Sequence, residues 1–176
     1  TFGVNAAIFG MVAHGLITGM LFFAAGSIQE RFGTRELSRL GGLLTRAPRL
    51  GWIFGFCCMA SLGLPGLAGF WGEFPAILAA YSPAAGIAGN EPLLFRVYMG
   101  VAALGTVLAA GYLLWMLQRV AFGRVKEEWR DLHVHDVHTV EWITWTPMLV
   151  LIAALGIYPD LIFRVTDASV TRFFGG

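Results

Sequence analysis

Residues 62–74 read LGLPGLAGFWGEF, and this stretch decides the architecture because it places a helix break and a carboxylate inside apolar sequence. The apolar segment around it runs from about 50 to 81, which is too long for one straight membrane span of about 20 residues. Pro65 cannot donate a backbone hydrogen bond to the preceding turn, and Gly63 and Gly66 make the interruption flexible. Freed backbone groups at membrane depth must be covered by protein or line a wet cavity. The sequence therefore predicts a broken membrane helix that faces the interior of a bundle.

The composition of the whole chain requires the same environment. Of its 176 residues, 57% are hydrophobic and only 13% are charged, and the mean hydropathy is +0.69. A water-soluble domain has about a quarter of its residues charged, so this chain could not cover its own surface in water. The formal net charge of +1 provides no basic field for nucleic acid. We therefore expect a lipid bilayer as the surroundings, and we exclude a cytosolic enzyme and a nucleic-acid-binding protein.

Windows of bilayer length predict four membrane helices. Their approximate ranges are 4–28, 50–81, 93–122 and 145–163. The second helix is expected to be broken near 63–66, and the whole chain, 1–176, is expected to form one membrane domain without tandem repeats. Residues 82–92 are expected to form a loop on one side of the membrane, and 124–141 a polar loop on the other. The predicted fold class is an all-α polytopic membrane helix bundle.

Basic residues predict the orientation of these helices. Most of them follow the first or the third helix, namely Arg31, Arg35, Arg39, Arg46, Arg49, Arg124, Lys126 and Arg130. By the positive-inside tendency this side is cytoplasmic, so both ends of the chain are expected on the outer side. Abundant Ala, Gly and Arg favour a bacterial plasma membrane. Apolar sequence begins almost at Thr1 without a charged region or a cleavage site, so we expect no signal peptide and expect further sequence upstream.

Glu73 is the strongest candidate for chemistry. A carboxylate in the middle of a membrane helix costs about 2.5–3.5 kcal/mol on insertion scales unless it finds water or a partner. Proton or ion relay is the usual reason to keep such a group, and a structural ion pair or a bond to backbone freed by Pro65 is the alternative. Discontinuous helices beside an acid inside the membrane are typical of transporters. Pro75 predicts a further bend shortly after Glu73.

His14 is a second candidate, near the middle of the first helix, with Thr18 one turn later on the same face. An imidazole exchanges protons near neutral pH, so His14 and Thr18 are candidates for a path of protons or water. A neutral histidine that is hydrogen-bonded between helices is an equally good interpretation of His14.

Other polar groups and small residues carry weaker predictions. His133, His135, Asp136 and His138 suit no common zinc spacing, and we expect no metal there. Cys57 and Cys58 are adjacent on a predicted helix, which makes a shared disulfide implausible. Two small-residue patterns, Gly15-x-x-x-Gly19 and Gly51-x-x-x-Gly55, are interpreted as helix-packing surfaces.

Several of these motifs together resemble one family. They are His14-Gly15-Leu16, the loop 31–42, the run at 62–74 and Leu155-Gly156-Ile157-Tyr158-Pro159 before an amphipathic tail. Nearly the whole chain is similar to the C-terminal part of the antiporter-like, proton-pumping subunits of NADH:quinone oxidoreductase, respiratory complex I. The L and N chains of that family usually have lysine after the Pro-Gly break, whereas the M chain has glutamate. Glu73 therefore indicates an M-type chain, represented here by its last four helices.

The resemblance implies a subunit of a redox-driven proton translocase. It implies that Glu73 carries protons near the outward exit, and that His14 belongs to the hydrated axis that leads to it. Flavin mononucleotide, iron–sulfur clusters and the quinone site would lie on other subunits, with none on this chain, and the partners would include the L and N subunits. The glutamate and lysines of the upstream relay would precede Thr1. A sodium/proton antiporter of the Mrp type, a membrane-bound hydrogenase and a purely structural membrane subunit are the alternatives.

Overall fold

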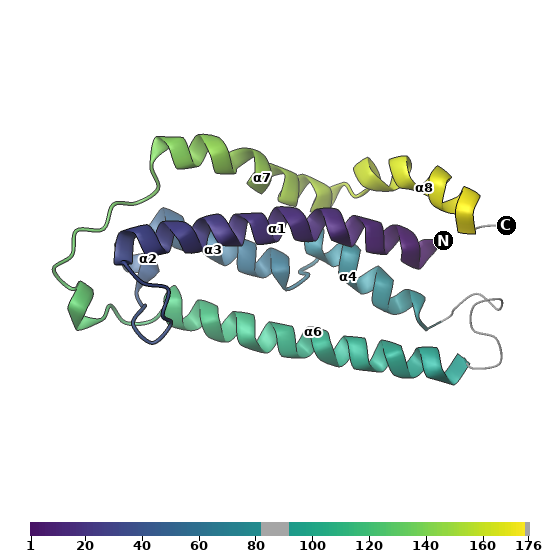
Figure 1. The fold of residues 1–176 in the computed structure, drawn as a ribbon, viewed down its shortest axis with the longest axis horizontal. Helices are drawn as coiled ribbons and strands as arrows, with labels where there is room; N and C mark the ends of the chain where they lie inside the picture. Colours follow the sequence, from purple (N-terminus) through teal and green to yellow (C-terminus); the bar gives the residue numbers. More distant parts are fainter. Residues whose placement is uncertain (82–91, 175–176) are drawn as a thin grey trace.

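The computed structural model describes residues 1–81 and 92–174, and these residues are helical apart from short connections (Figure 1). In chain order the elements are α1 (Phe2–Phe32), α2 (Leu43–Arg46), α3 (Pro48–Ser61), α4 (Ala68–Ala79), α6 (Pro92–Val120), the 3-10 turn η1 (Glu127–Trp129), α7 (Thr139–Ile157) and α8 (Asp160–Phe174). The predicted all-α class is confirmed. Helices α1, α6 and α7 are long and apolar enough to cross a membrane.

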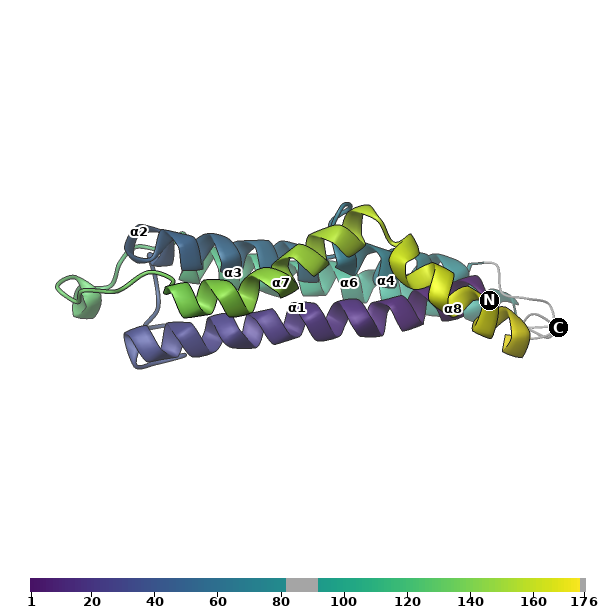
Figure 2. The ribbon, with the colours of Figure 1, turned by 90° about the horizontal axis from the view of Figure 1, so that it is seen from above.

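Helix α1 forms the axis of the bundle. Its buried apolar residues recur every three or four positions, as a helix with one packed stripe requires: Phe9, Ala13, Ile17, Met20, Ala24 and Ile28. Helices α3, α4, α7 and α8 pack around this stripe, and the contact of α1 with α4 is the most extensive (Figures 1 and 2). The hydrophobic core therefore follows α1 along its length.

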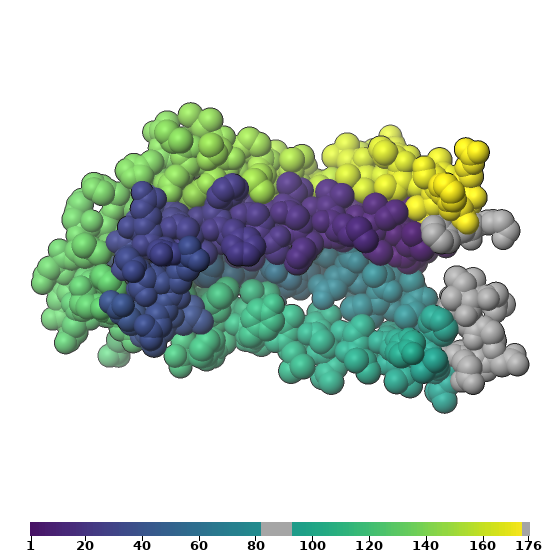
Figure 3. All heavy atoms as spheres, viewed as in Figure 1, coloured from purple at the N-terminus to yellow at the C-terminus, as the bar shows by residue number. Residues whose placement is uncertain are grey.

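Helix α6 is more loosely attached. It packs through Leu113, Leu117 and Val120 near its C-terminal end, where it contacts α3, while most apolar side chains earlier in the helix are exposed. Figure 3 shows α6 as a separate ridge with a hollow between it and α1. Helix α6 is therefore held to the rest of the described bundle mainly near its C-terminal end.

The region expected to hold one broken helix contains two helices with a tight turn between them. Helix α3 ends at Ser61, and Gly63 then adopts φ 69°. Residues 64–67 form a turn in which the amide of Leu67 donates to the carbonyl of Leu64 at 3.1 Å, with Pro65 second and Gly66 third at φ 92°. Proline followed by a glycine of positive φ is the sequence that a type II turn requires. Helix α4 then begins at Ala68 and continues through Pro75 to Ala79.

Helix ends differ from the predicted ranges where polar contacts or proline intervene. The helix expected at 4–28 extends to Phe32, because Gly33 closes it in the left-handed conformation and donates to Gln29. The single helix expected at 145–163 is instead α7 and α8, since Pro159 keeps the preceding residue out of the α region. Helix α6 ends two residues before the predicted limit. The predicted loop at 82–92 lies outside the described residues except for Pro92, which begins α6.

The predicted polar loop at 124–141 also contains helix. Residues 127–129 form η1, and α7 already begins at Thr139. The backbone amide of His138 donates to the Glu141 carboxylate at 2.7 Å, which stabilises this early start of α7. The connection from α6 to α7 lies at the end of the bundle that is far from both chain termini (Figure 1).

Candidate functional site

Glu73 lies on α4 with its carboxylate directed between α6 and the turn that precedes α4. The hydroxyl of Thr106, on α6, donates to Oε1 of Glu73 at 2.8 Å. The other oxygen, Oε2, lies against Gly63, where a Cβ atom would come within 2.9 Å of it. Glu73 is half-buried. The absence of a side chain at Gly63 leaves room for one of its carboxylate oxygens, and the hydroxyl of Thr106 is a hydrogen-bond donor to the other.

A cavity of about 380 Å³ connects the two residues singled out in the sequence. His14 of α1 and Glu73 of α4 both line it, together with Ser61 at the end of α3 and Tyr112 of α6. The backbone of three glycines, Gly10, Gly69 and Gly72, also lines this cavity. A polar cavity of this size has room for several water molecules. The structure therefore brings His14 and Glu73 to one space that can hold water.

Thr18, the third predicted residue, lies one turn further along α1 and is not among the residues that line this cavity. Its hydroxyl donates to the carbonyl of His14 at 2.5 Å, within the same helix. This bond occupies the only proton of the hydroxyl. Thr18 therefore supports the backbone beneath His14 in this structure.

Glycines at a helix crossing explain why His14 and Glu73 meet. Gly10 of α1 and Gly72 of α4 touch backbone to backbone, and a Cβ atom on Gly72 would overlap the Cα atom of Gly10. Close approach of this kind is the usual role of glycine between membrane helices. Since Gly10 precedes His14 by one turn and Gly72 precedes Glu73 by one residue, the crossing sets the positions of both side chains.

Helix α7 contacts the turn at 64–67. The indole of Trp71 donates to the carbonyl of Gly156 at 2.7 Å, and the backbone of Gly156 lies directly against Gly66 and Leu67. These contacts join the turn to α7 on one side, while Leu64, Pro65 and Gly66 themselves are exposed in the described chain. The sequence did not predict the roles of four residues at this site, because no local pattern indicates a contact with another helix. They are Trp71, Thr106, Tyr112 and Gly156.

Glu73 has no ion-pair partner among residues 1–81 and 92–174, where the four ion pairs involve other carboxylates. A second acid, Glu141 of α7, is paired with Arg31 of α1 at 2.7 Å and accepts the hydroxyl of Ser27 at 2.6 Å. Arg31 also donates to the carbonyls of His135 and Asp136 at 2.7 and 3.0 Å. This second cluster joins α1 to α7 and was not predicted.

The residues weighed as metal ligands have other roles here. The carboxylate of Asp136 accepts the amides of Arg49 and Leu50 at 3.0 and 3.1 Å, which caps the first turn of α3. The rings of His133, His135 and His138 lie against one another, with neighbouring centroids 5.0 and 5.9 Å apart. Within the described part of the chain no group of three or more His, Cys, Asp or Glu residues could hold a metal ion.

The two cysteines and most glycines of the small-residue patterns lie in packed parts of the structure. Cys57 and Cys58 are both buried free thiols. A Cβ atom at Gly19 would come within 3.0 Å of Met148 of α7, and one at Gly51 would contact Leu44, so these two glycines lie in packed surfaces. A Cβ atom at Gly55 would lie 3.8 Å from Leu117 of α6, whereas one at Gly15 would meet nothing within 4 Å among the described residues, so the packing contact predicted for Gly15 is not seen there.

Comparison with known proteins identifies the family. Residues 1–88 match the family described as NADH:quinone oxidoreductase/Mrp antiporter, transmembrane. The chain belongs to this family of membrane proteins. The M-type resemblance seen in the sequence is confirmed by relatives that align over nearly the whole chain.

Among these relatives, NADH-quinone oxidoreductase subunit M of Rhodobacter capsulatus is 39% identical over 171 residues, 97% of this chain and 31% of that protein. F(420)H(2) dehydrogenase subunit M of Methanosarcina mazei is 35% identical over 181 residues, 99% of this chain and 34% of that protein. A solved structure, respiratory complex I from Thermus thermophilus with bound NADH, superposes with a TM-score of 0.74 at 30% identity, covering 92% of this chain and 32% of the matched one. The chain spans about a third of the length of these relatives.

Proposed function

We propose that this chain is the C-terminal third of a proton-translocating membrane subunit of NADH:quinone oxidoreductase. The observation that carries the proposal is the cavity shared by His14 and Glu73 beside a helix interruption. A carboxylate with a hydroxyl donor and adjoining water space can change its protonation without breaking an ion pair. The M-type relatives, one of them an NADH-quinone oxidoreductase subunit, support the assignment of the complex.

In this proposal α3 and α4 together form one interrupted membrane span. At about 1.5 Å per residue, helices of 14 and 12 residues together reach across about 30 Å of hydrocarbon, and neither does so alone. With α1, α6 and α7 this gives four spans, and the break at Gly63, Pro65 and Gly66 lies at membrane depth. The basic end of the bundle faces the cytoplasm of a bacterium, and both chain ends face outward.

The hydroxyl of Thr106 gives Glu73 a partner in both protonation states. When Glu73 is ionised, Thr106 donates to it across the 2.8 Å contact. When Glu73 is protonated, its O–H donates to the oxygen of Thr106, whose proton turns to the carbonyl of Ala102 at 3.3 Å. Rotation of one hydroxyl therefore follows the arrival and departure of a proton. His14 supplies protons to the cavity through water, and release from Glu73 is directed outward.

The redox chemistry is assigned to other parts of the complex. Flavin mononucleotide, the iron–sulfur clusters and the quinone site belong to other subunits in this proposal, and this chain supplies only groups that move protons. The partners are other membrane subunits, including the homologous L and N chains. Upstream proton-carrying residues lie on helices of the same protein that precede Thr1.

The test is the variant Glu73→Gln in the intact complex, in membrane vesicles, with proton uptake measured per NADH oxidised. We expect loss of most coupled proton uptake, because glutamine keeps the size and the hydrogen bond but cannot carry a proton. His14→Gln should lower the same ratio less. Glu127→Gln is the matched control, since Glu127 is an exposed acid in η1 with 92% of its side chain accessible. Normal proton uptake after replacement of both His14 and Glu73 would contradict the relay and favour a structural role.

A second candidate is the same membrane machinery attached to another electron donor or to none. Two findings support this second candidate: the match to F(420)H(2) dehydrogenase subunit M and the Mrp antiporters named in the family description. A subunit of a membrane-bound hydrogenase is a candidate for the same reason. Copurification with NADH:quinone oxidoreductase activity supports the first proposal. Sodium tolerance conferred on a sensitive host, without that activity, would support an antiporter.

A further inference from the structure

A second cavity, of about 510 Å³, lies where α6 ends, at the end of the bundle far from the chain termini. One wall comes from the segment after α1, with Leu37, Ser38 and Leu40. The other comes from the last turn of α6 and the residues after it, with Trp115, Gln118, Arg119, Gly123, Arg124 and Lys126. The lining therefore holds three cationic side chains and no carboxylate, which favours an anionic ligand.

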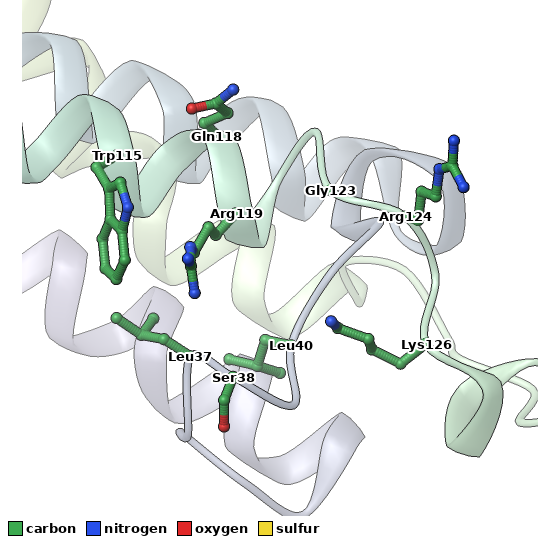
Figure 4. Close-up of a pocket in the computed structure, with 9 residues that line it drawn as sticks. All are labelled: Leu37, Ser38, Leu40, Trp115, Gln118, Arg119, Gly123, Arg124 and Lys126. Atoms are coloured by element: carbon green, nitrogen blue, oxygen red, sulfur yellow. The ribbon is translucent and has the colours of Figure 1, made fainter.

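Two of the three cations are directed toward the same space. Figure 4 shows Arg119 and Lys126 pointing toward Leu37, Ser38 and Leu40, whereas Arg124 points away. The guanidinium of Arg119 lies over the ring of Trp115, 4.2 Å from its centroid. Of the ion pairs in residues 1–81 and 92–174, none involves Arg119, Arg124 or Lys126.

The nearby acids are engaged elsewhere. Glu128 is bound by Arg39 at 2.8 Å, and the carboxylate of Glu36 accepts the hydroxyl of Ser38 at 2.7 Å. Arg119 and Lys126 consequently face the cavity with unshared donors. An anion there would meet a guanidinium and an ammonium, while the hydroxyl of Ser38 is directed to Glu36.

Backbone contacts fix the two walls relative to each other. Gly41 lies directly against the carbonyl of Arg124, and Gly42 lies directly against Val125. The amide of Leu44 donates to the carbonyl of Ala121 at 3.1 Å. Because these contacts tie the segment after α1 to the end of α6, the cavity is built by packed backbone and not by surface side chains alone.

An exposed apolar stripe leads along α6 to this cavity. Val101, Leu104, Leu108 and Trp115 share one face of the helix at spacings of three, four and seven residues, and all are exposed. Tryptophan and basic residues at the end of a membrane helix mark the level of lipid headgroups. We propose that the cavity binds the phosphate of an anionic phospholipid, with the acyl chains along this face of α6. The proposal is independent of proton transfer at Glu73.

The experiment uses the intact complex in vesicles that contain a photoreactive phosphatidylglycerol, with a matched phosphatidylcholine probe as comparison. Labelled peptides are mapped by mass spectrometry. We expect adducts on residues 115–126 from phosphatidylglycerol and few from phosphatidylcholine. One basic residue changes affinity for anionic lipid by about fivefold, so the double variant Arg119→Gln, Lys126→Gln should bind about thirtyfold more weakly. Unlabelled phosphatidylglycerol should compete, and inorganic phosphate should not.

Two further variants control for structure. Arg130→Gln removes an exposed cation at the same end of the bundle, outside the cavity lining, and should leave labelling unchanged. The exchange Arg119→Lys, Lys126→Arg keeps the charges and should retain most labelling, which separates loss of binding from failure to fold. Equal labelling by both lipids, full labelling of the Gln double variant or loss of labelling in Arg130→Gln would overturn the proposal. Competition by inorganic phosphate alone would show a site for free phosphate and would also overturn it.

Discussion

Two acids in the apolar helices, Glu141 and Glu73, are treated in opposite ways by the fold. Glu141 is held by the guanidinium of Arg31, by the hydroxyl of Ser27 and by the backbone amide of His138. Glu73 receives one hydroxyl and faces a cavity that it shares with His14. The donors around Glu141 favour its ionised form. Glu73 has a single hydroxyl donor and an adjoining cavity, so its protonation can change.

The contrast separates a part of the bundle that is fixed from a part that can respond to a proton. A carboxylate with a cation and several donors gives structural strength, because protonation would break every one of those bonds. A carboxylate with one rotatable donor and space for water exchanges a proton at little structural cost. The position of an acid in an apolar helix therefore does not reveal its role until its partners are known.

The largest expected effect is on the fixed cluster. Arg31→Met leaves the half-buried Glu141 without its cation, and we expect a loss of about 3 kcal/mol in the free energy of unfolding, the lower end of the range for buried pairs. Thermal denaturation of the intact complex measures this. The double variant Arg31→Met, Glu141→Met should recover part of the loss, since both charges are removed together while the other hydrogen bonds of the cluster stay broken. Wild-type stability of the single variant would show that this cluster does not hold α1 to α7.

The next effect concerns the helix crossing that positions the cavity. Gly72→Ala forces α4 away from Gly10, at an expected cost of about 1–3 kcal/mol and with reduced proton uptake per NADH oxidised. The control is Gly15→Ala on α1, because a Cβ atom at Gly15 meets nothing within 4 Å in the described chain. If both alanine variants pump normally, the crossing does not set the relation between His14 and Glu73.

A smaller effect is expected at the hydroxyl donor of Glu73. Thr106→Val preserves volume but removes the hydroxyl that follows the proton at Glu73, and loss of one bond of about 1 kcal/mol from the transition state of proton transfer would lower the rate of coupled proton uptake about fivefold. Thr144→Val is the matched control, since the hydroxyl of Thr144 donates only to carbonyls of its own helix. Equal rates in the two variants would mean that Thr106 takes no part in proton transfer.

The smallest effect belongs to an exposed ion pair at the end of the bundle. Arg39 donates to Glu128 and lowers the pKa of that carboxyl below its ordinary value of 4.5. Since the pKa is lowered on folding, the pair stabilises the protein above pH 4.5, and the contribution is lost as the pH falls through the lowered pKa. Glu128→Gln should shift thermal denaturation slightly at neutral pH and not in acid. A large shift that persists in high salt would contradict this interpretation.

Composition and local sequence were enough to predict a membrane environment, the helical class and the interruption before α4. These features follow from composition and from local backbone chemistry, because proline and glycine act within a few residues of where they stand. Local chemistry also separated α7 from α8 at Pro159, a signal that the prediction of one helix at 145–163 overlooked.

Which polar groups meet depends on the packing of helices that are distant in the sequence. Arg31 and Glu141 are 110 residues apart, and Thr106 lies 33 residues from Glu73, so no local pattern connects them. Contacts of this kind depend on how separate helices cross, and here the crossing depends on bare backbone at Gly10 and Gly72. A single sequence shows that an acid is present in an apolar helix, while the packing of distant helices decides whether a cation or a water-sized space lies beside it.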